Sequence, residues 1–168
     1  MSQLKVNSIV PVGGLPSGAN GGIIQCIQTF KNDATSTTSN TFVDLAGMSA
    51  TITPSSNSNK ILVRFSLCLS TSATALIIVN LLRGSTNIAQ PSTTPTRHGT
   101  VIAYVAEGSQ MMQGYEFLDS PATTSATTYK LQWRNHLAGY TSKLNEYFSV
   151  SDGDYAATST MTLMEVTV

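Results

Sequence analysis

The sequence contains few charged residues. Lys and Arg together number 9, Asp and Glu number 9, and the formal net charge of the 168-residue chain is zero. Charged residues make up 11% of the chain, whereas soluble domains contain roughly 25%. Nucleic-acid binding and attachment to anionic membranes both need clustered Lys and Arg, and the sequence has no such cluster. We therefore expect no nucleic-acid partner and no membrane insertion.

Residues that usually carry catalysis or hold metals are also scarce. The two histidines are His98 and His136, and the sequence contains no HExxH, CxxC or GxSxG spacing. Asp152 and Asp154, with Glu146 nearby, are the only candidates for a glycosidase pair or a Ca²⁺ site. Two acids beside a glycine are more typical of a turn that caps its own backbone. We expect no enzyme and no cofactor, and the calcium site stays open.

Long hydrophobic runs are absent too. The longest strongly apolar run covers residues 75–82, well short of the roughly 20 residues of a membrane helix. The N-terminal MSQLKVNSIVPVGG has no basic region followed by a long apolar stretch, so we expect no secretory signal and folding in a cytoplasm. Cys26 and Cys68 lie in apolar alternating segments, where a reduced, buried cysteine is the usual state.

Hydroxyl residues take the place of the missing charge. The chain has 21 Ser and 23 Thr, and these mostly alternate with aliphatic residues or form short polar runs. Thr at alternate positions suits a pleated strand with one wet face. Because 41% of the residues are hydrophobic, enough apolar surface remains to form a core. The composition therefore predicts a folded protein made mainly of strands.

Period-two alternation predicts an all-β fold. It is clearest over residues 61–70, where Ile61, Val63 and Phe65 alternate with more polar positions. About ten short strands separated by regular turns describe an antiparallel β-sandwich of the jelly-roll type over residues 23–168. A short hairpin strand is expected at Ile88. The other expected strands cover residues 23–30, 42–45, 48–53, 73–83, 101–106, 111–118, 129–137, 147–150 and 158–168.

Residues 73–83 are apolar on both faces of the expected strand. One face would pack in the core, and the other, with Leu76, Ile78 and Leu82, would need a second cover. A second subunit is the simplest source of that cover, so these residues are candidates for an oligomer interface. Trp133 joins them as either a core or an interface residue. A helix over residues 73–82 is the alternative, because short apolar runs are ambiguous by period.

A candidate binding surface consists of planar cationic and aromatic side chains expected on loops and on one polar strand face. Such groups stack on sugar rings or anchor protein interfaces. The candidates are Arg97, His98, Arg134, His136 and Tyr140.

Residues 1–22 differ from the remainder of the chain. LKVNSIV could form one short strand, but PVGGLPSGANGG contains five glycines and two prolines, which oppose both helix and strand. Fully extended, this segment would reach about 70 Å. We expect an arm outside the core that docks on a larger particle or exchanges between subunits. Its apolar docking residues would be Leu4, Val6, Ile9 and Val10.

Several segments together resemble a known family. They are LKVNSIV, GIIQCIQTFK, STTSNTFVDLAGMSATITPSSNSNKILVRFSL, LLRGSTNIA, FLDSPATTSATTYKLQW and STMTLMEV. They look like segments of the virion structural proteins and tail-fibre terminal domains of marine bacteriophages, especially cyanophages. The strand pattern is also similar to the trimeric jelly-roll heads of the tumour necrosis factor and complement type.

This resemblance implies a virion structural protein assembled in the host cytoplasm. The expected form is a homotrimer that acts as a capsid decoration, cement or head-fibre subunit, with other virion proteins as partners. The alternative is a short tail-fibre or receptor-binding protein that recognises a host-surface glycan.

Overall fold

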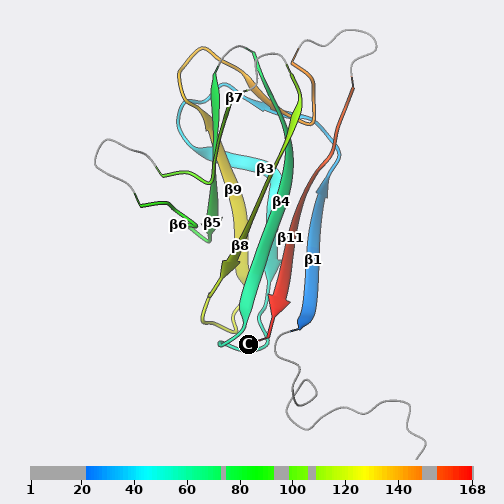
Figure 1. Ribbon diagram of the computed structural model, residues 1–168, viewed down its shortest axis with the longest axis vertical. Helices are drawn as coiled ribbons and strands as arrows, with labels where there is room; N and C mark the ends of the chain where they lie inside the picture. Colours follow the sequence, from blue (N-terminus) through cyan, green and yellow to red (C-terminus); the bar gives the residue numbers. More distant parts are fainter. Residues whose placement is uncertain (1–21, 73–74, 93–98, 106–108, 149–154, 168) are drawn as a thin grey trace, which may run out of the picture.

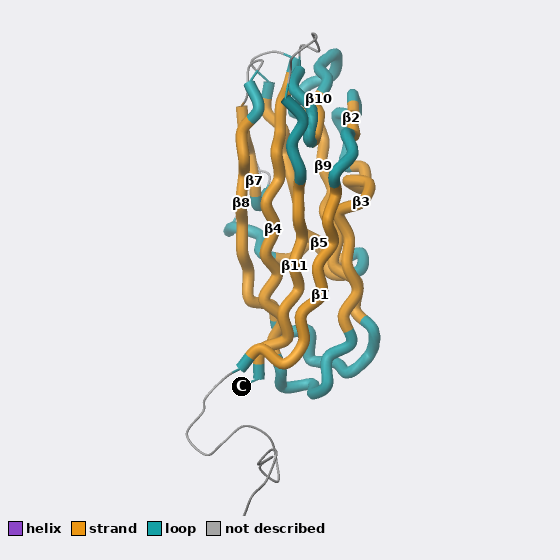
Figure 2. Tube along the Cα trace, turned by 90° about the vertical axis from the view of Figure 1, so that its right-hand side faces the viewer, coloured by secondary structure: helices purple, strands orange, loops and turns teal. Residues whose placement is uncertain are grey.

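The computed structural model describes residues 22–72, 75–92, 99–105, 109–148 and 155–167. Across these ranges the protein is all-β, with eleven strands in two sheets (Figures 1 and 2). The same ranges contain no helix that could cross a membrane. The strands run along the long axis of the molecule (Figure 1). The predicted all-β sandwich is confirmed.

The first sheet has four main strands that lie side by side in Figure 1. Their order is β1 (Ile23–Lys31), β11 (Ser159–Val166), β4 (Lys60–Thr71) and β8 (Met111–Asp119). Two short strands extend this sheet at its upper end, β2 (Thr35–Thr37) and β10 (Ser142–Leu144). β4 is therefore the central strand, paired with β8 along one edge and with β11 and then β10 along the other.

The second sheet packs behind the first. Its order is β3 (Val43–Ile52), β9 (Thr127–Asn135) and β5 (Leu76–Arg83). The far edge of β5 pairs with two short strands in succession, β7 (Ile102–Val105) and β6 (Thr86–Ile88). All pairings in both sheets are antiparallel.

The strand order is that of a jelly roll. One sheet runs β1-β11-β4-β8 and the other runs β3-β9-β5-β7. The chain crosses between the sheets from β2 to β3, β3 to β4, β4 to β5, β7 to β8, β8 to β9 and β9 to β10. The first and last strands, β1 and β11, are thus neighbours in one sheet, as in a jelly roll built from two Greek keys.

The core follows from the alternation in the sequence. The inward positions of β4 are Ile61, Val63, Phe65, Leu67 and Leu69, and all are buried. They face the inward residues of the second sheet, which include Ile77, Val79, Leu81, Leu131 and Trp133. The two sets form one continuous cluster.

β3 joins two of the predicted strands through a bulge. Its pairing with β9 shifts register between Asp44 and Ser49, so Leu45 and Met48, three residues apart, both point into the core. Gly47 lies at this shift with a φ of 78°, a conformation that favours glycine. The break in alternation was predicted at the right place, but residues 42–45 and 48–53 were predicted to be two separate strands.

Three predicted features differ from the structure. The apolar segment at 73–82 contains strand β5, so the helix alternative is wrong. Of the strand predicted at 147–150, Tyr147 and Phe148 lie outside any strand, and residues 149 and 150 lie outside the described residues. The short strands β2 and β10 formed instead in segments that we expected to be loops. Both depend on pairing with residues far away in the sequence.

The described chain begins and ends at the same end of the sandwich, the lower end in Figure 1. The backbone amide of Gly22 donates to Oγ1 of Thr167 at 3.0 Å, and the amide of Thr167 donates to the carbonyl of Gly22 at 3.0 Å. Residues 1–21, which include the predicted docking residues Leu4, Val6, Ile9 and Val10, lie outside the described residues.

Candidate interaction surfaces

The predicted binding surface is only partly within the described chain. Arg97 and His98 lie outside the described residues. Arg134 and His136 lie at the end of β9, and Tyr140 follows in the next loop. His136 is exposed, whereas Arg134 and Tyr140 are half-buried. The structure therefore brings these three to one end of the second sheet.

Arg134 is already engaged within the chain. Its Nη1 donates to the carbonyl of Asn40 at 3.2 Å and to the carbonyl of Asn135 at 3.3 Å. The guanidinium also lies over the ring of Phe42, 5.2 Å from the centroid, a favourable cation–π arrangement. A ligand at this position would have to compete with these contacts.

The other polar residues on this face of β9 are also paired. Nζ of Lys130 and Nε2 of Gln132 donate to the carboxylate of Asp44 on β3, at 2.9 and 2.8 Å. The hydrogen bond from Lys130 and, to a smaller extent, the one from Gln132 lower the pKa of Asp44 below its ordinary value. On the outer face of β9, Lys130, Gln132 and Arg134 are therefore engaged in contacts within the chain that stabilise the sheet, and their donor groups are not open to a ligand.

Most of the residues predicted to form an oligomer interface on β5 are buried within the single chain. Ile78 and Leu82 are only 7% and 4% exposed within the single chain, and Leu76 is half-buried. The second face of β5 is therefore covered without a second subunit. Trp133 is 1% exposed and belongs to the core cluster, the first of the two roles that its sequence position allowed.

The side chains beside the outer face of β5 include those of the neighbouring strand β9. Ile78 pairs with Arg134, and Leu82 pairs with Lys130, whose long aliphatic stems can lie over apolar neighbours while their charged ends stay in water. Strands β6 and β7 flank the opposite edge.

The acidic candidates do not form a described metal site. Asp152 and Asp154 lie outside the described residues, and Glu146 forms an ion pair with Lys143 at 3.2 Å. Within the described ranges no group of three or more His, Cys, Asp or Glu side chains is placed to hold a metal ion.

The outer face of the first sheet was not among the predicted surfaces. Strand register arranges its side chains in rows that run across β1, β11, β4 and β8. One row is polar and consists of Gln28, Thr162, Arg64 and Glu116. The next row towards the upper end consists of Phe30, Thr160, Ser66 and Gly114. The row on the other side is apolar and consists of Cys26, Met164, Leu62 and Leu118.

Two open hollows lie on this face, one on each side of β4. The first lies between β4 and β8, with Arg64, Ser66, Gly114 and Glu116 among its lining residues. The second, of about 300 Å³, lies over β1, β11 and β4 and shares Arg64 and Ser66 with the first. Short side chains at Ser66, Thr160 and Gly114 lie in one row beside the longer side chains of Arg64 and Glu116, and all five residues line the hollows.

Arg64 and Glu116 differ from the charged residues of the second sheet. They are exposed and lie opposite each other on β4 and β8. Among the described residues, neither side chain forms a hydrogen bond or an ion pair. Both are therefore free to contact something outside this part of the chain.

Cys26 also lies on this face, which corrects its predicted burial. β1 turns Gln25 and Ile27 towards the core, so Cys26 faces outward at the edge of the sheet and is exposed. Cys68 is buried as predicted, and burial raises the pKa of its thiol. Both cysteines are free thiols, as predicted.

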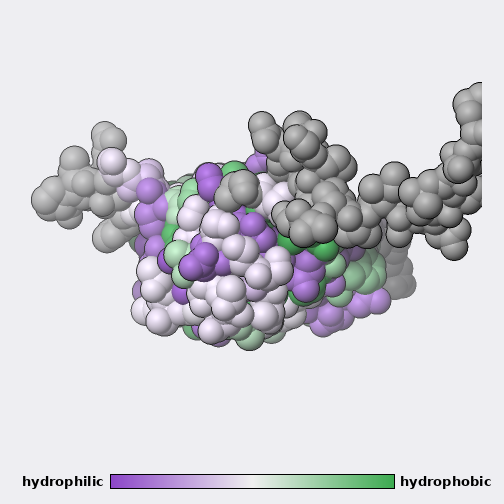
Figure 3. Space-filling view, turned by 90° about the horizontal axis from the view of Figure 1, so that it is seen from below, coloured by the Kyte–Doolittle hydropathy of each residue, from purple (hydrophilic) through white to green (hydrophobic). Residues whose placement is uncertain are grey.

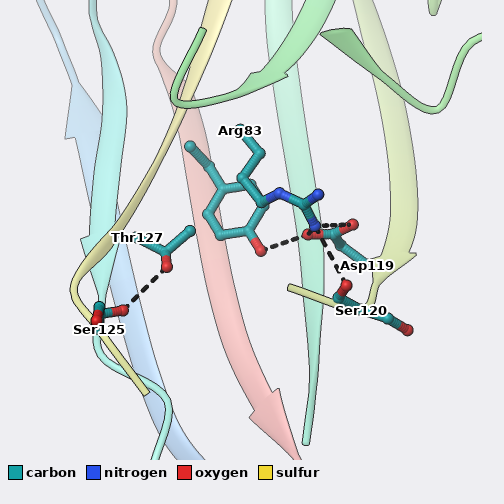
Figure 4. A network of polar contacts seen from close by, with 6 residues as sticks. Arg83, Asp119, Ser120, Ser125 and Thr127 are labelled. Atoms are coloured by element: carbon teal, nitrogen blue, oxygen red, sulfur yellow. Dashed lines mark hydrogen bonds and ion pairs between the residues drawn. The ribbon is translucent and has the colours of Figure 1, made fainter. Parts of the chain in front are cut away.

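A partly buried ion pair connects the two sheets near the lower end. Nη1 of Arg83 on β5 donates to both oxygens of Asp119 on β8, at 3.0 and 2.8 Å, and to the carbonyl of Ser120 (Figure 4). The hydroxyl of Tyr129 donates to the same carboxylate at 2.6 Å. Burial, reinforced by Asp119, raises the pKa of Tyr129, so the phenol remains a donor. With its carboxylate occupied, this cluster is structural.

The lower end carries hydroxyl-rich loops. Ser and Thr dominate the loops at 53–59 and 120–126, and Figure 3 shows a mostly pale surface there, neither strongly hydrophobic nor strongly hydrophilic. Local bonds such as that between the hydroxyls of Ser56 and Ser58 occupy part of this polar surface.

Comparison with solved structures finds similarity to the VP2 protein of infectious bursal disease virus. A mutant VP2 from T=1 particles is 11% identical, with the match covering 97% of this chain and 42% of that chain at a TM-score of 0.47. VP2 from a subviral particle is 13% identical, covering 94% of this chain and 44% of that chain at a TM-score of 0.41. This chain thus spans less than half the length of the VP2 chains that it matches. No protein-family model and no curated protein matches the sequence.

The rows on the first sheet could not be found from the sequence alone. Alternation over 61–70 does put Arg64 and Ser66 on the outer face of one strand. Their neighbours Glu116, Gly114, Thr160 and Thr162 come from strands about 50 and 100 residues away, and the pairing registers that align them are a property of the folded sheet.

Proposed function

We propose that this protein is a virion structural protein whose jelly-roll domain is presented on the particle. The observation that carries the proposal is the strand order β1-β11-β4-β8 facing β3-β9-β5-β7, a double Greek key that capsid domains use. Because one fold hosts many functions, the proposal also uses the similarity of several segments to marine phage virion proteins. On these two grounds, the strand order and the similarity of the segments, we propose a capsid decoration, cement or head-fibre subunit.

The chemistry of the surface agrees with such a role. The net charge is zero, and the loops at the lower end consist mainly of Ser and Thr. A neutral, hydroxyl-rich surface has little long-range attraction for nucleic acid or anionic membrane. It suits a protein that recognises its neighbours by shape.

We also propose that the protein assembles with itself as a homotrimer. The support is the similarity of the strand pattern to the trimeric jelly-roll heads of the tumour necrosis factor and complement type, because the face of β5 that first suggested a partner is covered within one chain. Sedimentation of the full chain at micromolar concentration tests the proposal. A trimeric mass is expected, and a monomer at all concentrations would contradict self-assembly.

The structural role is tested on purified particles of the virus that encodes this chain. Peptide mass spectrometry should find the protein in particles at a fixed copy number, and electron microscopy at side-chain detail should place a two-sheet sandwich of this strand order on the capsid surface. Absence of the chain from washed, infectious particles would exclude the proposal. Density at the tail instead of the capsid would favour the second candidate.

The second candidate function is a receptor-binding protein for a host-surface glycan. The observation in its favour is the pair of open hollows on the outer face of the first sheet, with Arg64 and Glu116 free of partners in the described chain. This face, rather than the Arg134 region, is where a ligand would meet open donors and acceptors.

A further inference from the structure

The two hollows beside β4 share Arg64 and Ser66, so together they form one trough across the outer face of the first sheet. We propose that this trough binds a short neutral oligosaccharide. The proposal rests on the second candidate function, for which it names a site and a ligand class. It does not depend on whether the protein is a capsid subunit.

The floor of the trough is the row of short side chains. Thr160 and Ser66 place hydroxyls there, and Gly114 places only a hydrogen. A Cβ at Gly114 would lie 3.6 Å from the carbonyl oxygen of Phe65, an ordinary contact distance. Neither space nor backbone conformation requires glycine at this position, so its effect is to keep the floor open. Glycine within a strand often marks a place where a ligand approaches the backbone.

The wall of the trough is the polar row. It presents the amide of Gln28, the guanidinium of Arg64 and the carboxylate of Glu116, while Thr162 between Gln28 and Arg64 is buried, 7% exposed. Nε2 of Gln28 donates to Oγ1 of Thr162 at 2.9 Å, which orients both groups before any ligand arrives. Sugar hydroxyls donate and accept at once, and this row offers both partners.

The charge of the wall selects against ionic ligands. The positive charge of Arg64 faces the negative charge of Glu116 across one strand spacing. A phosphate, sulfate or sialic acid would gain from the first and be repelled by the second. A neutral ligand is not repelled by either charge, and its hydroxyls can form hydrogen bonds to both Arg64 and Glu116.

An exposed aromatic ring lies on β1 beside the trough, outside the residues that line the two hollows. Phe30 is 59% exposed and in register with Thr160 on β11. Rings of this kind bury the apolar C–H face of a sugar while its hydroxyls point towards polar groups. From Gln28 on β1 to Glu116 on β8 the trough crosses three strand spacings, roughly 14 Å. That length and the open ends favour a short oligosaccharide over a single sugar.

The test uses the full chain on an array of neutral, sialylated and sulfated oligosaccharides. Titration of the strongest neutral binder into ¹⁵N-labelled protein then maps the site. We expect the largest shifts at the amides of Ser66, Gly114 and Thr160. Binding confined to charged glycans, or shifts centred on Arg134 and His136, would overturn the proposal. So would the absence of glycan binding at millimolar concentration.

Two variants and a matched control make the test specific. Gly114→Val fills the floor and Arg64→Ala removes wall donors, and each should weaken binding by about tenfold or more. Leu118→Val changes an exposed residue on the same strand and face outside both hollows, and should leave affinity unchanged. Undiminished binding by a folded Gly114→Val protein would overturn the site. All three variants should still load on particles, which separates this proposal from the structural one.

Discussion

Glu165 carries a buried carboxylate near the end of β11. Its side chain is 1% exposed, and one oxygen accepts three hydrogen bonds, from the amide and hydroxyl of Ser55 at 2.7 Å each and from Nδ2 of Asn59 at 2.6 Å. Burial alone would raise the pKa of Glu165, but the bonds from Asn59 and Ser55 outweigh it and lower the pKa below its ordinary value of 4.5. The carboxylate thereby fixes the β3–β4 loop.

This arrangement predicts a pH-dependent contribution to stability. Because the folded pKa is lower than the unfolded one, the contribution is complete above the unfolded pKa and disappears as the pH falls through the folded pKa. Glu165→Gln should therefore lower the free energy of unfolding by about 1–3 kcal/mol at pH 7. In urea titrations the gap to wild type should narrow at pH 3. A gap of equal size at both pH values would contradict this account.

Asn145 is a second buried polar residue whose hydrogen bonds connect several strands. Its Nδ2 donates to the carbonyls of Lys31 and Asp33 at 3.0 and 3.1 Å, and its Oδ1 accepts from Ser159 at 2.6 Å. The residue is buried, and its φ of 63° lies in the left-handed region that Asn tolerates. It connects the end of β10 to β1 and β11.

Replacing Asn145 should destabilise the sandwich without touching either proposed surface. Asn145→Ala loses three buried hydrogen bonds, an expected cost of about 3 kcal/mol in chemical denaturation. Asn145→Gly loses the same bonds but has no Cβ in the left-handed conformation, so it should be the more stable of the two variants. The reverse order would show that backbone conformation at this position is unimportant.

At the scale of elements, the β3 bulge depends on Gly47. Its φ is 78°, and a Cβ there would lie 3.1 Å from Cδ of the buried Lys31. Gly47→Ala should therefore cost about 1–2 kcal/mol from the backbone alone, with crowding against Lys31 in addition. Thermal or urea unfolding measures the loss.

Gly114→Ala is the matched comparison. The same chemical change falls at a position without a positive φ, where the new Cβ meets only Phe65 O at 3.6 Å. It should alter stability by less than about 0.5 kcal/mol, as surface substitutions generally do. Equal losses for the two alanine variants would refute the special role of the bulge.

Alternating polar and apolar residues predicted most strands. The other strands form because they pair with segments that are distant in the sequence. Residues 61–70 alternate so strictly that β4 and its inward face were predictable, as was the apolar β5. The three-residue strands β2 and β10 form mainly by pairing with each other and with β4, so no local signal precedes them. The same reason hides the trough, because Gly114 and Ser66 become neighbours only when β8 pairs with β4.

At the scale of the whole molecule, the jelly roll puts first and last strands together. β1 pairs with β11 along most of its length, and Gly22 closes the pairing through Thr167. Both ends of the described chain therefore leave the lower end of the sandwich.

This arrangement predicts that residues 1–21 serve docking and not folding. A chain that starts at Gly22 keeps the bonds to Thr167, so its melting temperature should change by less than about 3 °C, equivalent to roughly 1 kcal/mol. Loading onto particles should nevertheless be lost. Full-length protein with Leu4, Val6, Ile9 and Val10 changed to Ser should fail to load as well, since it keeps the length but not the apolar side chains. Loading by the shortened chain would refute the docking role, and its unfolding would refute the domain boundary.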